Sequence, residues 1–380
     1  MRILIAIGLP RQKEAGAAGV VVNHARELAK RGHQVDCWFL GDVLEKPVRP
    51  RRLEALIFAI RLARRILRER GRYDVVNLHA PSGCVYGLWR KMFGPLGAPP
   101  CVMTMQGSEE RFVRALRREQ RKHRAWNFGW KNRLWHRIYH QTMYDFAIST
   151  ADYGAVANRE AWICAELKYG REPGRFWYMP NGAEENFFVE RVYTEQLALR
   201  LLYVGTWLDR KGVYYLADAF RLLSQRIPNV ALTVAGSSAS AEQVKQFFVP
   251  EVRGRAEVIP FVKREEMLAL YAEHDIFVFP SLVEGMPLTL LEAMATAMPV
   301  VTTNTCGMAD IVEDGVNGVL VPAADAQNLA DAVERLCRSP ELRRQLGQEA
   351  QKTMRRHTWE CIARKLEAVL ARAAQSGGGN

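Results

Sequence analysis

Short apolar runs alternate with amphipathic helical patterns along the first half of the chain. Residues 20–31 and 51–70 show the spacing of helices with one apolar stripe, and Gly32 stops the first of them. Such an alternation predicts a parallel sheet with helices on both faces. The apolar runs expected to be strands are 3–7, 35–40, 75–78, 102–105 and 146–149.

The same alternation returns in the second half, after a polar stretch around 184–197. The chain is therefore predicted to be α/β, with two Rossmann-like doubly wound domains facing across a cleft. Open α/β sheets bind ligands beyond the carboxyl ends of their strands. The second set of strands is expected at 201–204, 231–235, 257–259, 276–279, 300–302 and 318–321.

Composition fits this organisation. The chain has 380 residues and 48% hydrophobic residues, enough for two or three domain cores. No run of about 18 uncharged apolar residues exists, so no spanning helix is expected. The short apolar start is typical of a first strand rather than a signal segment. The seven Cys include no C-x-x-C pair, which indicates reduced thiols in a cytoplasmic protein.

Positive charge is concentrated in the first half of the chain. Residues 1–195 hold 33 Lys and Arg against 20 Asp and Glu, a net charge of +13. Residues 196–380 hold 20 against 21, a net charge of −1. The asymmetry indicates a polyanionic partner for the first half, which would be a membrane surface, a nucleic acid or an acidic substrate.

The most informative segment follows the predicted strand 276–279. It carries Glu284, then Gly285, Met286, Pro287 and Leu288 at an expected helix start, then Glu292. Backbone N–H groups at a helix start have no internal partners and favour phosphate. Carboxylates accept hydrogen bonds from hydroxyls. We therefore interpret the segment as a backbone phosphate-binding site flanked by two carboxylates that bind sugar hydroxyls. The alternative is an ordinary strand, turn and helix.

A second cluster follows the predicted strand 201–204. Gly205 begins a turn that leads to Arg210 and Lys211. Two cations at the carboxyl end of a strand suit a diphosphate, with Lys as a point charge and Arg as a fork. Without other signals this is equally a solvated loop with two surface cations.

These residues together resemble the E-x7-E signature and its surroundings in the family 4 retaining glycosyltransferases, which have the GT-B fold. The resemblance is strong over 179–360. It rests on the following pieces of sequence: Glu284 to Glu292, Pro299-Val300-Val301-Thr302-Thr303, Cys306-Gly307, Asp314-Gly315-Val316-Asn317-Gly318, Val204-Gly205 with Lys211-Gly212, and Pro180-Asn181-Gly182.

The resemblance implies a donor nucleotide-sugar on the second domain and an acceptor on the first. It assigns the donor sugar's hydroxyls to Glu284, the ribose to Glu292 and the diphosphate to Lys211. We expect Arg210 to supply the second cation, although the family pattern does not place one there. The resemblance implies further donor contacts at Gly205 and Gly307, and at the backbone of Val262. The first loop, with Gly16 and Gly19, would lie near the donor phosphates. Because this loop lacks G-x-G-x-x-G, it is not a dinucleotide fingerprint.

The pattern along the chain predicts the domain limits and a disordered Gly-rich tail, and the resemblance implies the crossing helix and a mechanism. The domains expected are 1–195 for the acceptor, 196–355 for the donor, a helix at 356–373 crossing back to the first domain, and a disordered tail at 374–380. The acceptor would attack from the front face, and the donor phosphate would help to deprotonate it. No D-x-D motif occurs, so neither a metal nor a cofactor is expected.

Two positions depart from the family pattern. Thr206 stands where the family usually has Arg, and Gln106 stands where it usually has His near the donor sugar. Gln donates and accepts hydrogen bonds but does not titrate, which argues against acid–base chemistry at this position. His79 follows another predicted strand and is interpreted as structural or acceptor-side.

Two basic segments fit a membrane surface. Cations interleaved with Trp and Tyr suit an anionic bilayer, although single-stranded nucleic acid or a solvated face with inward aromatics remain alternatives. We expect the bilayer and no nucleic acid, which predicts a cytoplasmic protein peripheral on the inner face of the membrane. The membrane-contact candidates are Arg61, Arg65, Arg68, Arg114, Arg118, Arg121, Trp126, Trp130 and Trp135.

The sequence thus predicts a retaining, metal-independent glycosyltransferase that uses a sugar or lipid-linked acceptor in surface glycan or glycolipid synthesis. One alternative is a nucleotide-sugar epimerase of the same fold, which would need acid and base groups around the sugar. The other is a non-catalytic basic module that binds a membrane or nucleic acid, but it leaves the second half's motifs unexplained.

Overall fold

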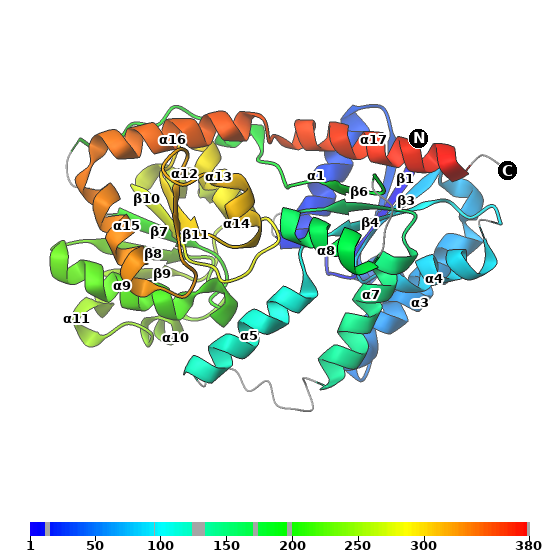
Figure 1. The fold of residues 1–380 in the computed structure, drawn as a ribbon, viewed down its shortest axis with the longest axis horizontal. Helices are drawn as coiled ribbons and strands as arrows, with labels where there is room; N and C mark the ends of the chain where they lie inside the picture. Colours follow the sequence, from blue (N-terminus) through cyan, green and yellow to red (C-terminus); the bar gives the residue numbers. More distant parts are fainter. Residues whose placement is uncertain (12–15, 95, 124–133, 170–173, 196–199, 378–380) are drawn as a thin grey trace. The chain divides into compact units, whose positions relative to one another are not determined.

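The computed structural model describes the chain except residues 12–15, 95, 124–133, 170–173, 196–199 and 378–380 (Figure 1). Contacts divide it into two units. Unit 1 comprises 1–110, 128–181 and 359–380, and unit 2 comprises 111–127 and 182–358. Each unit contains one parallel six-stranded sheet. The predicted class, α/β with two Rossmann-like domains, is confirmed. The division differs from the predicted limits, since it falls at 181 and assigns 111–127 to unit 2.

Unit 1 has the strand order β2-β1-β3-β4-β5-β6. Its strands are β1 (Arg2–Ala6), β2 (Gln34–Trp38), β3 (Val75–His79), β4 (Cys101–Met105), β5 (Tyr153–Val156) and β6 (Phe176–Tyr178). Its helical elements are α1 (Gly16–Lys30), α2 (Leu40–Val43), η1 (Arg51–Leu53), α3 (Glu54–Arg68), η2 (Arg70–Arg72), α4 (Cys84–Phe93), η3 (His136–Gln141), α7 (Thr142–Thr150), α8 (Arg159–Tyr169) and α17 (Trp359–Gly377). Helix α5 (Glu109–His123) begins in unit 1 and continues in unit 2.

Helices cover the unit 1 sheet on both faces, as expected for strands buried throughout. All five residues of β3 and of β4 are buried. Helix α17 packs on α1 and against β3, β4 and β5, while α3, α4 and α7 pack together (Figure 1). An ion-pair group joins α17 to the end of α1: Glu367 accepts from Arg31 at 2.6 Å and contacts His33 at 2.7 Å. The last helix of the chain is thus part of the first unit's fold.

The prediction of a strand at 146–149 is wrong, because these residues lie in α7. Met143, Ala147 and Ile148 are buried there at helical spacing, whereas Phe146 is exposed. The strand comes later, at β5, where Gly154 leaves room for Phe176 of β6. A short apolar run has no clear period, so a buried helix segment and a buried strand look alike in sequence.

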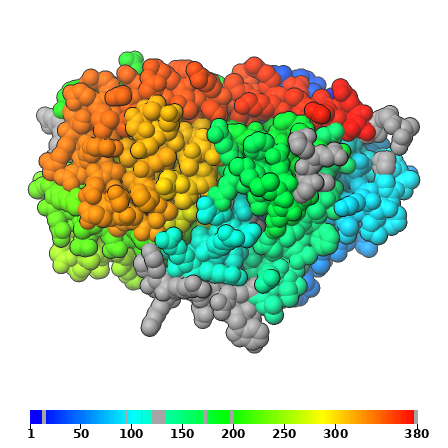
Figure 2. Space-filling model, in the orientation of Figure 1, coloured from blue at the N-terminus to red at the C-terminus, as the bar shows by residue number. Residues whose placement is uncertain are grey.

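Unit 2 has the strand order β12-β11-β10-β7-β8-β9. Its strands are β7 (Arg200–Val204), β8 (Ala231–Ala235), β9 (Ala256–Ile259), β10 (Ile276–Phe279), β11 (Val300–Thr303) and β12 (Val319–Val321). Its helical elements are η4 (Glu185–Phe187), η5 (Asp209–Lys211), α9 (Val213–Arg226), α10 (Ala241–Lys245), α11 (Pro250–Arg253), η6 (Arg264–Glu266), α12 (Met267–Glu273), α13 (Leu288–Ala295), α14 (Cys306–Ile311), α15 (Ala326–Arg338) and α16 (Pro340–Arg355). The outer surface of α15 and α16 is orange in Figure 2.

The central strand of unit 2 positions the site. Strand β10 lies between β7 and β11, all parallel, so the loops that follow β7 and β10 leave the same edge of the sheet. Helix α13 follows β10 and is apolar on nearly every side, which suits a helix enclosed by protein. The sequence elements around 205–212 and 284–292 are therefore neighbours in space.

Two local expectations are corrected. Pro287 is the N-cap of α13, in extended conformation, rather than its first helical residue. The residues 374–377, expected to begin a disordered tail, form the last turn of α17, and Ala373 just before them is buried in unit 1.

Candidate functional site

The loops after β7 and β10 are pressed together. Gly212 follows η5 with φ +73°, and a Cβ there would lie 1.9 Å from the carbonyl oxygen of Pro280. The amide of Leu282 donates to the carbonyl of Arg210 at 2.8 Å. Only a glycine allows this approach, which holds Arg210 and Lys211 beside Glu284.

Glu284 is the centre of a buried charge cluster. Its Oε1 accepts from Lys211 Nζ at 2.7 Å, from Arg210 Nη1 at 2.8 Å and from Ser281 Oγ at 2.8 Å. The side chains of Lys211 and Glu284 are each 11% exposed. Lys211 Nζ also lies 4.9 Å from the centre of the Phe279 ring. The structure thus brings together the three residues predicted to be catalytic.

The electrostatics of this cluster keep Glu284 ionised. Burial acts to raise its pKa, but Lys211 and Arg210 outweigh burial, and the pKa lies below the usual range. Burial lowers the pKa of Lys211, and its contact with Glu284 opposes that shift. A buried cation and a buried anion each need the other, because an unpaired charge in the interior is very costly.

Glu292 lies in a second buried network. Its Oε1 accepts from Arg264 Nη1 at 2.5 Å, and its Oε2 accepts from the Tyr271 hydroxyl at 2.9 Å. Arg264 Nη2 donates to Glu184 Oε1 at 2.8 Å. Burial raises the pKa of Glu292 despite these donors. Glu292 is predicted by its motif, whereas Arg264, Tyr271 and Glu184 are not, because they come from three separate segments with no motif.

The other predicted donor-binding residues of unit 2 frame these two clusters. A Cβ on Gly307 would lie 1.9 Å from the carbonyl oxygen of Gly285, so α14 begins in contact with the loop after β10. Met286 is buried and Leu288 begins α13. Gly205 follows β7 directly, and Val262 is half-buried after β9. All of them lie at the carboxyl edge of the unit 2 sheet.

The remaining predicted donor contacts belong to unit 1. Gly16 begins α1 with φ +58°, and Gly19 is buried one turn later. Gln106 follows β4 and is half-buried. His79, which the sequence predicted to be structural or acceptor-side, ends β3 and is 1% exposed. Gln106 and His79 therefore lie at strand ends of the first sheet, and a ligand-binding role for this edge stays a prediction.

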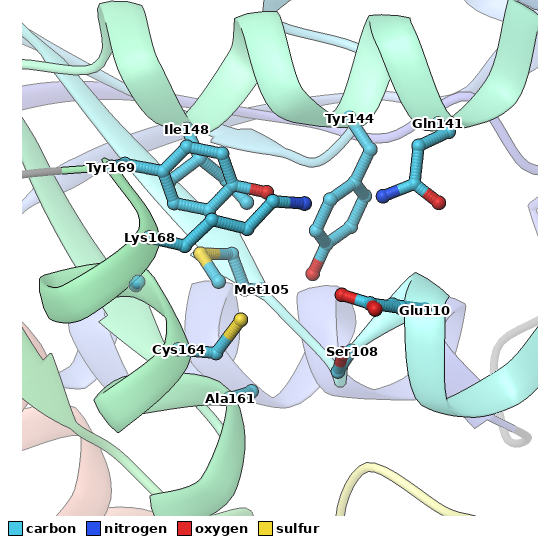
Figure 3. Close-up of a pocket in the computed structure, with 11 residues that line it drawn as sticks. Met105, Ser108, Glu110, Gln141, Tyr144, Ile148, Ala161, Cys164, Lys168 and Tyr169 are labelled. Atoms are coloured by element: carbon cyan, nitrogen blue, oxygen red, sulfur yellow. The ribbon is translucent and has the colours of Figure 1, made fainter. Parts of the chain in front are cut away.

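A small pocket in unit 1 lies beyond β4 (Figure 3). Met105 lines it together with side chains from α5, η3, α7 and α8. No sequence pattern pointed to it, because its polar groups come from four elements. These polar groups belong to Ser108, Glu110, Gln141, Tyr144, Lys168 and Tyr169.

The membrane-contact candidates divide into three groups. Arg61 and Arg68 on α3, and Arg114 and Arg118 on α5, are exposed. Arg65 instead lies 4.0 Å over the Trp38 ring and pairs with Glu69, and Trp135 stacks on Tyr139 and packs against the unit 1 core. Trp126 and Trp130 lie outside the described residues, as does the side chain of Arg121.

No helix in the described part of the chain is long and apolar enough to cross a membrane. No group of three or more His, Cys, Asp and Glu is arranged to hold a metal ion among those residues.

Comparisons with known proteins give consistent results for both halves. Residues 15–184 match the model of "Glycosyltransferase Family 4", and residues 184–353 match that of "Glycosyl transferases group 1". A curated relative, the amylovoran biosynthesis glycosyltransferase AmsK of Erwinia amylovora, is 33% identical over 145 residues, 36% of each chain. The first curated relatives are matched over only about two fifths of their length.

Solved structures show the same fold. Sucrose-phosphate synthase from Thermosynechococcus elongatus aligns with a TM-score of 0.77 over 99% of this chain and 100% of its own, at 17% identity. HepE from Anabaena, in complex with UDP, aligns with a TM-score of 0.70 over 98% and 100%, also at 17% identity. Likenesses at this identity establish the fold alone.

Proposed function

Because the chain belongs to the family 4 glycosyltransferases, we propose that it transfers a sugar from a nucleotide-sugar to an acceptor hydroxyl with retention of configuration. The observation that carries this proposal is the buried cluster of Lys211, Arg210 and Glu284 at the carboxyl edge of β7 and β10. A fixed pair of cations there suits the departing diphosphate of such a donor.

In this proposal Lys211 and Arg210 stabilise the negative charge that develops on the leaving diphosphate. Preorganised cations in a water-poor site act most strongly on developing charge. Backbone amides of Gly285, Met286 and Leu288 add further donors before and at the start of α13. Because these groups neutralise the diphosphate, the reaction needs no metal ion.

The two carboxylates of the E-x7-E segment would accept hydrogen bonds from hydroxyls of the donor. Glu284 accepts from the donor sugar while it holds the two cations in place, and Glu292 accepts from the ribose. Gln106 supplies hydrogen bonds near the sugar, and the donor phosphate itself takes the acceptor's proton. HepE, which shares the fold, binds UDP, so UDP-sugars are the first donors to test.

We place the acceptor on unit 1 and the enzyme at the cytoplasmic face of a membrane. The net charge of +13 on residues 1–195 and the exposed arginines of α3 and α5 support this location. AmsK acts in amylovoran biosynthesis, which supports a role in surface glycan or glycolipid synthesis.

The test begins with thermal shifts of the protein against UDP-, GDP-, ADP- and CMP-sugars, because a ligand that binds only the folded state raises Tm. The donor that stabilises most is then assayed for release of nucleoside diphosphate, with and without EDTA. We expect release to survive EDTA and the product to keep the donor's anomeric configuration.

The variant Lys211→Ala should bind both the nucleotide-sugar and the free nucleoside diphosphate more weakly in calorimetry, because the cation meets phosphate. Loss of a charged hydrogen bond predicts a drop of about 10-fold to 100-fold in both affinities. Weaker binding of the sugar part alone would place the diphosphate elsewhere. Interconversion of donor epimers without transfer would establish the epimerase alternative.

A further inference from the structure

Arg264 connects the second carboxylate of the E-x7-E segment to a part of the chain outside that motif. It is the first residue of η6, which follows β9 after residues 260–263, and its guanidinium bridges two carboxylates. Nη1 donates to Glu292 at 2.5 Å and Nη2 to Glu184 at 2.8 Å. The guanidinium also lies 4.7 Å from the centre of the Phe187 ring. Its position is therefore fixed on three sides.

The bridge is shielded from water. The side chain of Glu292 is 5% exposed, and those of Arg264 and Glu184 are 17% and 21% exposed. Tyr271, whose hydroxyl donates to the other oxygen of Glu292, is completely buried. One guanidinium thus balances two carboxylates in a site where ion pairs are screened little by solvent.

We propose that Arg264 is a positioning residue for the donor's ribose, because it holds and orients the carboxylate of Glu292, while its second ion pair, with Glu184, limits how strongly it does so. This inference rests on the proposed function, which assigns the ribose to Glu292. A carboxylate offers about four lone-pair directions, and Arg264 and Tyr271 use two of them. The others accept from ribose hydroxyls, with an orientation that the planar guanidinium fixes.

Removing Arg264 and removing the charge of Glu184 should shift the pKa of Glu292 in opposite directions. Burial raises the pKa of Glu292, Arg264 counteracts the shift, and Glu184 adds to it. Without the guanidinium, Glu292 takes up a proton at higher pH and accepts hydroxyl protons less well. Without the charge of Glu184, Arg264 forms an ion pair with Glu292 alone, and Glu292 stays ionised to lower pH.

The experiment compares calorimetric binding of UDP, GDP and ADP with their 2′,3′-dideoxy analogues, which lack both ribose hydroxyls. The nucleotide that binds most tightly is used for the wild type, Arg264→Gln, Arg264→Lys and Glu184→Gln. Arg264→Gln should weaken binding of the ribose form by about 10-fold to 100-fold and leave the dideoxy form unchanged. Arg264→Lys, which keeps the charge, should recover part of the loss.

The pH dependence of the same affinity gives the second measurement. Binding should weaken as pH falls, with the midpoint moved to higher pH by Arg264→Gln and to lower pH by Glu184→Gln. Equal losses for ribose and dideoxy forms, or midpoints that move in the same direction, would overturn the role of Arg264. If the wild type binds a nucleotide that Lys211→Ala loses, these failures leave the proposed function standing; if no nucleotide binds, both are wrong.

Discussion

At the scale of single residues, Glu284 has more neighbours than the sequence suggested. The motif predicted a carboxylate that accepts from a sugar hydroxyl. The structure adds that its Oε1 accepts from Lys211, Arg210 and Ser281 together. Glu284 therefore also balances and positions the cations proposed to meet the diphosphate.

Replacing Glu284 separates these tasks. We expect Glu284→Gln to keep the fold. It should raise the activation free energy of transfer by about 2–3 kcal/mol, because the sugar loses a charged hydrogen-bond acceptor. The affinity for the free nucleoside diphosphate should stay the same or rise, because Lys211 and Arg210 no longer have a competing anion. Transfer rates and calorimetry measure both quantities.

Ser281→Ala is the matched control, because it removes one neutral donor from the same carboxylate oxygen and leaves its charge. It should change transfer far less than Glu284→Gln. A turnover of Glu284→Gln equal to that of the wild type would remove Glu284 from the site.

At the scale of elements, α1, β3 and α17 meet at two buried histidines. His24 of α1 is 3% exposed and His79 of β3 is 1% exposed. Within the described residues neither imidazole has a hydrogen-bond partner. The ring of His24 meets that of Trp359, the first residue of α17, edge-on at 5.4 Å. Unit 1 thus buries two imidazoles that are stable there only when neutral, and one of them lies against the first residue of α17.

This pair predicts a loss of stability in acid. Burial lowers the pKa of His24 to about 4 and that of His79 to about 3, from 6.5 in the unfolded chain. The unfolded state therefore binds more protons below pH 6.5, and stability falls as pH falls toward 3. Between pH 7.5 and pH 5 each imidazole should lower the free energy of unfolding by about 2 kcal/mol.

Hydrogen exchange in α1 and α17, measured at both pH values, reports this free energy. His24→Leu removes one of the two imidazoles and keeps an apolar contact to Trp359. On acidification its free energy of unfolding should therefore fall by only about half as much as that of the wild type. Equal losses in the wild type and His24→Leu would show that other groups control the acid response.

At the scale of the whole molecule, the charge is uneven along the chain. The net charge of +13 on residues 1–195 and −1 on the rest favours attraction of the first half to an anionic surface. Arg61 and Arg68 lie seven positions apart on α3, and both are exposed, so they present two charges on one face of the helix.

Liposome flotation tests the membrane proposal. The protein should float with vesicles that contain anionic lipid at low salt, and less at high salt, because charges beyond about 8 Å are screened at physiological ionic strength. Each basic residue near the surface contributes about 1 kcal/mol, so Arg61→Ser with Arg68→Ser should weaken binding roughly 30-fold.

The control is Arg335→Ser with Arg356→Ser, which removes two exposed arginines from unit 2 and should leave flotation unchanged. Equal flotation on neutral vesicles, or none on anionic ones, would favour a soluble acceptor.

The sequence by itself determined the fold class, nearly all of the strands and the segment that carries the candidate site. Strand and helix periods are local, and buried parallel strands such as β10 are apolar throughout, so they are visible in one dimension. The run at 146–149 was misread because four apolar residues have no distinguishable period.

Only the tertiary structure decided which charges meet. That β7 and β10 are neighbours follows from the strand order, and this order brings Lys211 to Glu284 across 73 positions of sequence. The partners of Glu292 come from η6 and α12, the second partner of Arg264 comes from the segment before η4, and the two histidines come from α1 and β3. Such contacts depend on packing between distant elements, and no pattern along the chain records them.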